Sequence, residues 1–112
     1  MKEVINQGIK LNRQILSSKE YIRYIETKNR LYQHPELSNA LNEFRRRNYE
    51  LQNRQDINPY DEVHALVREY DELLHNSIVS DFLNAERHIC KMMQKMYDAI
   101  AEGLEFDYLD GH

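Results

Sequence analysis

The chain has 112 residues, of which 41% are hydrophobic and 30% charged, and its formal net charge is −4. This length suits a single helical domain over residues 1–112 with a modest core, and a disordered chain would have fewer apolar residues. The negative net charge argues against a surface that binds duplex nucleic acid. A single cysteine excludes a disulfide framework within the chain. No apolar run approaches the ~18 residues that a membrane span needs. The first ten residues lack the apolar core of a signal peptide, so we expect a cytoplasmic protein.

Apolar residues recur at helical spacing along the chain, and capping signals divide it into about five helices. Ser17 and Glu20 form a capping box between the first two helices, and Pro35 and Pro59 each suit the first position of a helix. Gly103 is a C-terminal signal for the last helix. The expected ranges are 2–16, 18–33, 35–54, 59–75 and 77–104. The pattern predicts an all-α fold, an antiparallel helical bundle with a long C-terminal helix, in an oligomeric protein.

The last helix carries more apolar surface than one bundle needs. Its apolar arc covers roughly 200° of the circumference, whereas packing against one bundle needs a stripe a little over about 100° wide. A helix of about 27 residues also spans ~40 Å, while a compact chain of this size has a radius of gyration near ~13 Å. We therefore expect one flank of this helix to contact its own bundle and the other to contact a second chain or partner. The candidate interface residues are Ile78, Phe82, Ile89, Met92, Met93, Met96 and Ile100.

Three residues stand out on the predicted apolar faces. Glu86 lies inside the arc of the last helix, and a buried carboxylate must be paired or it neutralises; an Arg, Lys or Tyr from another helix is the expected partner. Cys90 lies on the same arc and is expected to be a buried small hydrophobe, with a redox or ligand role as the alternative. Gly8, on the face of the first helix, either permits close helix approach or merely weakens the helix.

A metal site is the main alternative among the polar motifs. Helical bundles that hold two metal ions use Glu-x-x-His on two helices, and Glu72-x-x-His75 matches this motif once, with Asp61-x-x-His64 as a weaker match. Both lie on one predicted helix about three turns apart and do not converge. We therefore assign no metal ligand, catalytic residue or cofactor, and expect surface and end-capping roles for these side chains.

The consecutive arginines Arg45, Arg46 and Arg47, with Arg54 further on, are the only basic cluster evident along the sequence. Three consecutive helical residues fan over about 200°, so they do not make a continuous stripe that could track phosphates. Pairing with Asp and Glu, or a solvated face, is the expected role, and weak RNA binding is the alternative.

The order of these signals resembles the YlbF/YmcA family of small helical proteins from Gram-positive bacteria. The matching segments are Ser-Lys-Glu-Tyr at 18–21, His-Pro-Glu-Leu at 34–37, Asn-Glu-Phe at 42–44, and the sequence from Asn76 to Glu86. The likeness covers residues 5–102. The resemblance implies an all-helical, oligomer-forming cytosolic protein without known catalysis. Better-studied relatives regulate competence, biofilm formation and sporulation, and they act as parts of a protein complex that is linked to RNA processing.

Some relatives carry cysteines that help hold an iron–sulfur cluster in that complex, but Cys90 stands alone in mid-helix and does not align with such a ligand, so no cofactor is expected. We predict a non-enzymatic regulatory or adaptor protein that acts through helix-mediated self-association, as a dimer or larger, and through contacts with other proteins. Neither membranes nor nucleic acids are expected partners.

Overall fold

The computed structural model describes residues 1–56 and 58–106, and within them the regular structure is entirely helical. The predicted all-α class and long C-terminal helix are confirmed. The six helices of the described chain are α1 (Lys2–Leu16), α2 (Lys19–Tyr32), α3 (Pro35–Gln52), α4 (Pro59–Glu69), α5 (Asp71–Leu74) and α6 (Ser77–Ala101).

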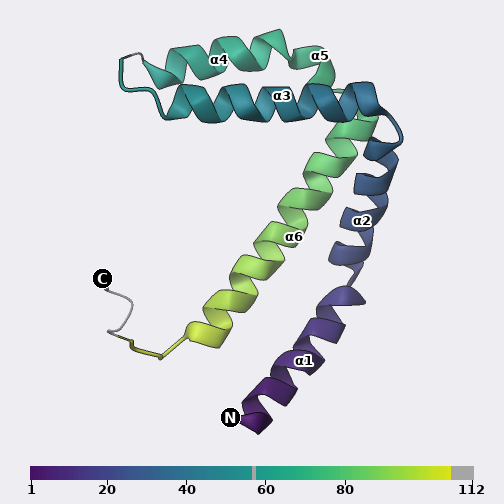
Figure 1. Ribbon diagram of the computed structural model, residues 1–112, viewed down its shortest axis with the longest axis vertical. Helices are drawn as coiled ribbons and strands as arrows, with labels where there is room; N and C mark the ends of the chain where they lie inside the picture. The colour runs from purple at the N-terminus through teal and green to yellow at the C-terminus, as the bar shows by residue number, and fades with distance from the viewer. Residues whose placement is uncertain (57, 107–112) are drawn as a thin grey trace.

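The helices form two arms rather than one compact bundle (Figure 1). α1, α2 and α6 make the long arm, in which α2 and α6 run antiparallel, and α3, α4 and α5 make a second arm that crosses its upper end. The principal extents are 51 × 37 × 18 Å and the radius of gyration is 18.6 Å, against about 13 Å for a compact chain of this length. The predicted antiparallel pairing is therefore present, but in two crossed hairpins.

Local capping signals explain where most helices begin. Asn58 and Asn76 accept backbone N–H bonds from Tyr60 and Ile78 at 3.0 and 2.9 Å, which satisfies donors that the first turn leaves free. The cap of α2 is one residue later than predicted: Ser18 accepts from the Tyr21 N–H at 3.2 Å. The predicted cap, Ser17, instead donates its hydroxyl to a carbonyl of α1 at 3.1 Å.

The helices differ from the sequence expectation at three further places, and the first is α3, which ends at Gln52 rather than at 54. α6 ends at Ala101 rather than 104 because Gly103 takes a positive φ of 81°, a conformation that glycine adopts without steric cost. The helix predicted over 59–75 is two helices, interrupted at Tyr70. The Tyr70 ring packs edge-on against Phe44 of α3 with centroids 5.3 Å apart, and the chain turns there toward α6.

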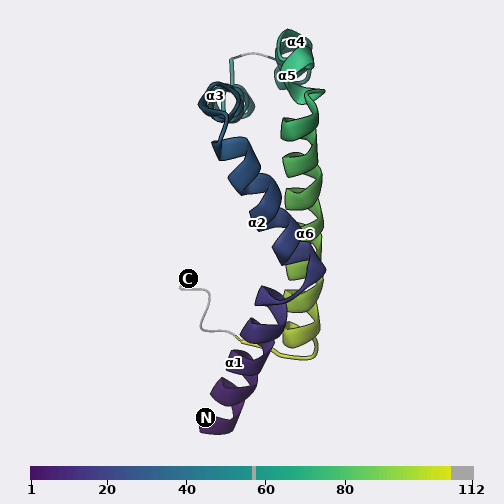
Figure 2. The ribbon, with the colours of Figure 1, turned by 90° about the vertical axis from the view of Figure 1, so that its right-hand side faces the viewer.

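The main core lies where the two arms meet. Leu31 of α2, Leu41 of α3, and Val79 and Phe82 of α6 are buried together, and Tyr24 packs its ring 5.7 Å from that of Phe82. Each such side chain contributes about 1.5–3 kcal/mol by burial. Figure 2 shows that α1 and the C-terminal half of α6 extend away from this junction along the long arm, so the core holds the arms together at one end only.

Candidate protein-interaction surface

α6 is apolar along its length, but the chain covers only its first half. Its buried residues, Val79, Phe82, Ala85 and Ile89, all precede residue 90. α2 begins at Lys19, and its Glu20 lines one surface hollow with Met92. Beyond Met92, therefore, the antiparallel partner of α6 has ended. The remaining turns of α6 keep their apolar residues without an intrachain helix to cover them.

The residues expected at an interface divide accordingly. Phe82 and Ile89 are 5% and 8% exposed, and Ile78 packs against the core, so these three belong to the fold of the chain itself. The other four residues lie on the second half of α6. The three methionine side chains among them are half-buried, and Ile100 is 56% exposed. We call these four residues the distal α6 face: Met92, Met93, Met96 and Ile100.

A second apolar surface, on α1, was not anticipated. All of α1 lies in the described chain and none of its residues is buried; Val4, Ile5, Ile9 and Leu16 are exposed, Val4 by 73%. Apolar periodicity shows that a helix has an apolar side, but it does not show that a neighbour lies against that side. We call these four residues the α1 face.

The junction between α1 and α2 explains why the α1 face is uncovered. Within residues 1–56 and 58–106, α2 is the only helix whose backbone approaches α1. The Ser17 and Ser18 N–H groups donate to Arg13 and Ile15 carbonyls at 3.1 and 3.0 Å, and the Ser18 hydroxyl donates to Ile15 at 2.7 Å. These bonds hold α1 nearly in line with α2 instead of folding it back on α6 (Figures 1 and 2).

Glu86 has the kind of partner that the sequence predicted. Arg45 of α3 donates two hydrogen bonds to its carboxylate, Nη1 to Oε2 at 3.1 Å and Nη2 to Oε1 at 2.5 Å. The Arg45 guanidinium also lies 5.6 Å from the centroid of the Phe82 ring, within range for a cation–π contact. Glu86 remains 28% exposed, so the pair lies at the margin of the core and joins the two arms.

The arginine cluster is used in ion pairs, as expected. Arg46 pairs with Glu50 at 2.9 Å and Arg54 with Asp56 at 2.8 Å. Their guanidinium groups are thus neutralised by neighbouring carboxylates, as Arg45 is by Glu86, and no continuous basic stripe forms from these residues. The hydrogen bond between Arg54 and Asp56 raises the pKa of Arg54 and lowers that of Asp56.

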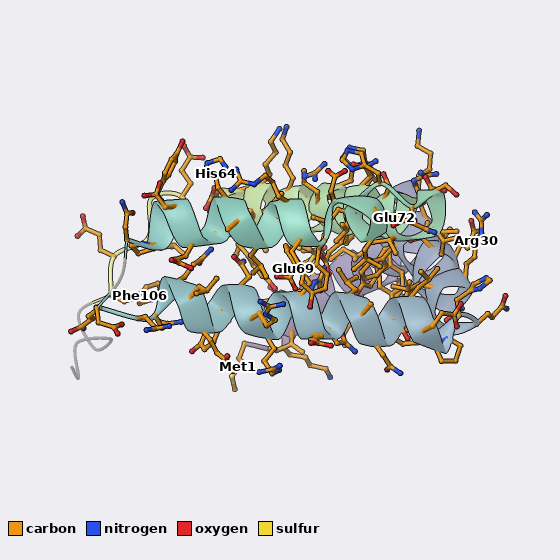
Figure 3. All side chains as sticks on the ribbon, turned by 90° about the horizontal axis from the view of Figure 1, so that it is seen from above. Met1, Arg30, His64, Glu69, Glu72 and Phe106 are labelled. Carbon is orange, nitrogen blue, oxygen red and sulfur yellow. The ribbon has the colours of Figure 1, made fainter. Side chains whose placement is uncertain are left out.

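Arg47 connects α3 to α4. It donates to the Glu69 carboxylate and, at 3.2 Å, to the Tyr70 hydroxyl, while its guanidinium lies 5.5 Å from the Tyr70 ring centroid. Figure 3 shows Glu69 pointing from α4 into the space between the two helices. The hydrogen bond from Arg47 lowers the pKa of Glu69, and the bonds to Glu69 and Tyr70 raise the pKa of Arg47.

The structure does not bring the motif residues of the alternative metal site together. His64 and Glu72 lie well apart along the α4–α5 segment (Figure 3), and the His64 ring packs against Tyr60 with centroids 4.4 Å apart. His75 contacts the Asp71 carbonyl through Nδ1 at 2.8 Å, at the end of α5. Across residues 1–56 and 58–106, no three His, Cys, Asp or Glu side chains are placed to share a metal ion.

Cys90 is exposed on α6, which contradicts the expectation of a buried small hydrophobe: it lies on the flank of the apolar arc that α2 does not cover. An iron–sulfur cluster is typically held by about four cysteine thiolates, and this chain contains a single cysteine. The residues present therefore do not fit such a cluster within one chain.

Comparison with known proteins identifies a family for this chain. None of the described helices has an apolar stretch that could cross a bilayer. No curated protein and no solved structure matches the chain at a significant level. Residues 4–105, which include all six helices apart from the first two residues of α1, match the family Com_YlbF, described as control of the competence regulator ComK, YlbF/YmcA. The chain therefore belongs to the YlbF/YmcA family of competence regulators.

Proposed function

We propose that this chain is a non-enzymatic cytoplasmic regulator that acts as an adaptor, through helix-mediated self-association and contacts with other proteins. The observation that carries the proposal is the distal α6 face, an apolar surface that continues the core-facing stripe of α6 beyond the point where α2 ends. Contiguous exposed apolar surfaces on small proteins are typical of protein–protein contact sites.

The shape of the molecule supports the same proposal. An open arrangement of two arms buries little of each helix, and an oligomer supplies the missing cover. Methionine is flexible and polarisable, so a face containing Met92, Met93 and Met96 can adapt to more than one partner surface. This suits an adaptor that binds copies of itself and also heterologous proteins.

The family description names control of a competence regulator, and changing which proteins are in contact is one way in which a non-enzymatic regulator acts. The resemblance to relatives that act in a complex linked to RNA processing favours protein components of such a complex as the heterologous partners. In this proposal the chain contributes surfaces, while any chemistry on RNA belongs to another subunit.

Complementation in cells tests the proposal. In the organism that encodes this chain, the gene is deleted and restored as wild type, as Met96→Glu, or as the control Gln94→Glu, and transcription of competence genes is measured. Gln94 is exposed and lies on the opposite side of α6 from Met96, so the control makes the same charge change away from the distal α6 face. We expect wild type and the control to restore regulation and Met96→Glu to fail at equal protein level. Full restoration by a Met96→Glu protein that is monomeric would overturn the proposal.

A further inference from the structure

The junction between the start of α2 and the middle of α6 carries a cluster of cations. Two adjoining surface hollows lie there, and they share two of their lining side chains, Glu20 and His88. All the other charged side chains that line these hollows are lysine or arginine. We call these cations together with His88 the basic face: Lys19, Arg23, His88, Lys91 and Lys95.

The basic face is opposite in sign to the chain as a whole. Its four cations and Glu20 together give a net charge of +3 with His88 neutral, whereas the whole chain has a net charge of −4. None of these four cations, nor Glu20, belongs to an ion pair within residues 1–56 and 58–106. Five other arginines do have carboxylate partners: Arg30, Arg45, Arg46, Arg47 and Arg54. The fold therefore leaves the positive charge of the basic face without a partner.

The sequence of α6 concentrates this charge on one side of the helix. Arg87, Lys91 and Lys95 follow one another at i, i+4 spacing, and like charges at that spacing destabilise a helix. Asp98 is the next carboxylate along α6, but it accepts a hydrogen bond from the Gln94 amide at 3.0 Å and belongs to no ion pair in the described part of the chain. Carboxylates from outside the chain would relieve the repulsion between these cations.

The size of the basic face limits what it can bind. Residues 88–95 of α6 span about 10 Å, and packed helices lie ~8–10 Å apart, so the charged side chains occupy an area roughly 10 Å on each side. Such an area accommodates about two turns of a helix or about three extended residues. One turn of a nucleic-acid duplex is about 34 Å long. A short protein segment therefore matches the basic face better in length than a duplex does.

The chemistry of the hollows favours carboxylates over a single-stranded nucleic acid. Proteins that bind single strands stack the bases on aromatic side chains, and the described residues that line these hollows include no aromatic ring. Their uncharged lining is Ala85 and Met92, which suits an aliphatic side chain beside carboxylates. We propose that the basic face binds a short acidic segment of a different protein, whose Asp and Glu side chains pair with the lysines and with Arg23. The inference rests on the contacts with other proteins proposed above and adds the surface and the kind of segment.

NMR titration of the full, nitrogen-labelled chain with decaglutamate tests the inference. We expect saturable chemical-shift changes centred on the basic face at low salt, and their loss at high salt, where exposed charges are screened. Charge reversal by Lys91→Glu together with Lys95→Glu, both exposed, should weaken the binding of decaglutamate about tenfold or more. The matched control is Lys10→Glu together with Arg13→Glu, which makes the same change at two exposed cations of α1. This control should bind decaglutamate as the wild type does.

Three results would overturn the inference. The first is an absence of saturable changes, or changes that spread equally over α1 and the basic face and are weakened equally in both double variants, because the attraction would then be nonspecific. The second is decauridylate that binds the same residues more tightly than decaglutamate, which would assign the face to nucleic acid. The third is a lower sedimenting mass of the Lys91→Glu, Lys95→Glu variant than of the wild type, which would mean that a second copy of the chain occupies the face. We expect an unchanged mass, so a failure of self-association and a failure of this inference are read from different measurements.

Discussion

Arg45 and Glu86 join the two arms of the molecule, with two hydrogen bonds between α3 and α6 and the guanidinium of Arg45 lying over the Phe82 ring. They are 41 residues apart in sequence. The contact places a charge-assisted pair at the edge of the main core, directly beside the buried ring of Phe82.

A double-mutant cycle on Arg45 and Glu86 measures the strength of this connection. We expect a coupling free energy of about 0.5–1 kcal/mol, typical of partly exposed pairs with good geometry, and a further loss of roughly 0.5–1 kcal/mol in Arg45→Ala from the cation–π contact. Arg45→Lys keeps the charge but cannot form the paired bonds, so it should recover less than half of the coupling. Urea unfolding of the four proteins is the measurement; additive effects of the two single changes would show that the pair contributes nothing.

Self-association is tested most directly at Met96. Wild type should sediment as a dimer or larger at micromolar concentration, and Met96→Glu should shift it toward monomer, because an unpaired carboxylate buried in an apolar contact costs several kcal/mol. Two-fold symmetry places the change twice in one interface. Gln94→Glu, with the same change in charge, should remain associated. A Met96→Glu protein that keeps both the wild-type mass and the wild-type stability would exclude the distal α6 face as the interface.

Acid should loosen the contact between α3 and α4 before the rest of the fold. The hydrogen bond from Arg47 lowers the pKa of Glu69 below its ordinary value of 4.5, so the folded state holds the ionised form more strongly than the unfolded state does. The resulting stabilisation is fully present above the unfolded pKa and is lost as the pH falls below 4.5 through the lowered folded pKa. Arg47 stays charged throughout this range.

Amide hydrogen exchange measures how acid loosens the contact between α3 and α4. Exchange in α4 is compared with exchange in α2 between about pH 3 and 6, after correction for the intrinsic pH dependence of exchange. Protection of α4 should fall selectively toward the acid end in wild type. In Glu69→Gln the protection of α4 should already be reduced at about pH 6 and change little on acidification. Equal acid sensitivity in both proteins would assign the effect to other carboxylates.

Replacing Gly8 with alanine distinguishes the two roles that the sequence left open for this residue, which are to permit close helix approach or merely to weaken the helix. A Cβ built on Gly8 meets no atom within 4 Å, so no close helix approach occurs there within the chain, and Gly8→Ala should stabilise α1 by about 0.5–1 kcal/mol. An interhelical separation of ~8–10 Å also leaves room for alanine in a dimer. Circular dichroism should show increased helix content. Weaker association of Gly8→Ala at unchanged helicity would instead mean that a partner backbone lies directly against this residue.

The sequence by itself determined the features that depend on neighbours along one helix. Proline and asparagine signals located the starts of α3, α4 and α6 correctly, because proline suits the first helical position and an asparagine cap bonds to residues two or three positions away. The period of apolar residues established the all-α class, and the position of Glu86 within that period required a charged or polar partner. Order along the chain was also enough to indicate the YlbF/YmcA family.

Only the tertiary structure decided which of those surfaces are covered. Periodicity gives an angle around one helix axis, but it does not say at which turn a neighbouring helix ends. Phe82 and Ile100 lie at the same angle on α6, yet one is buried by α2 and α3 and the other is open beyond the start of α2. The interruption at Tyr70, the choice of Arg45 as partner and the exposure of Cys90 have the same origin. Each depends on contacts between segments far apart in sequence, whose free energies are set by how the two arms cross.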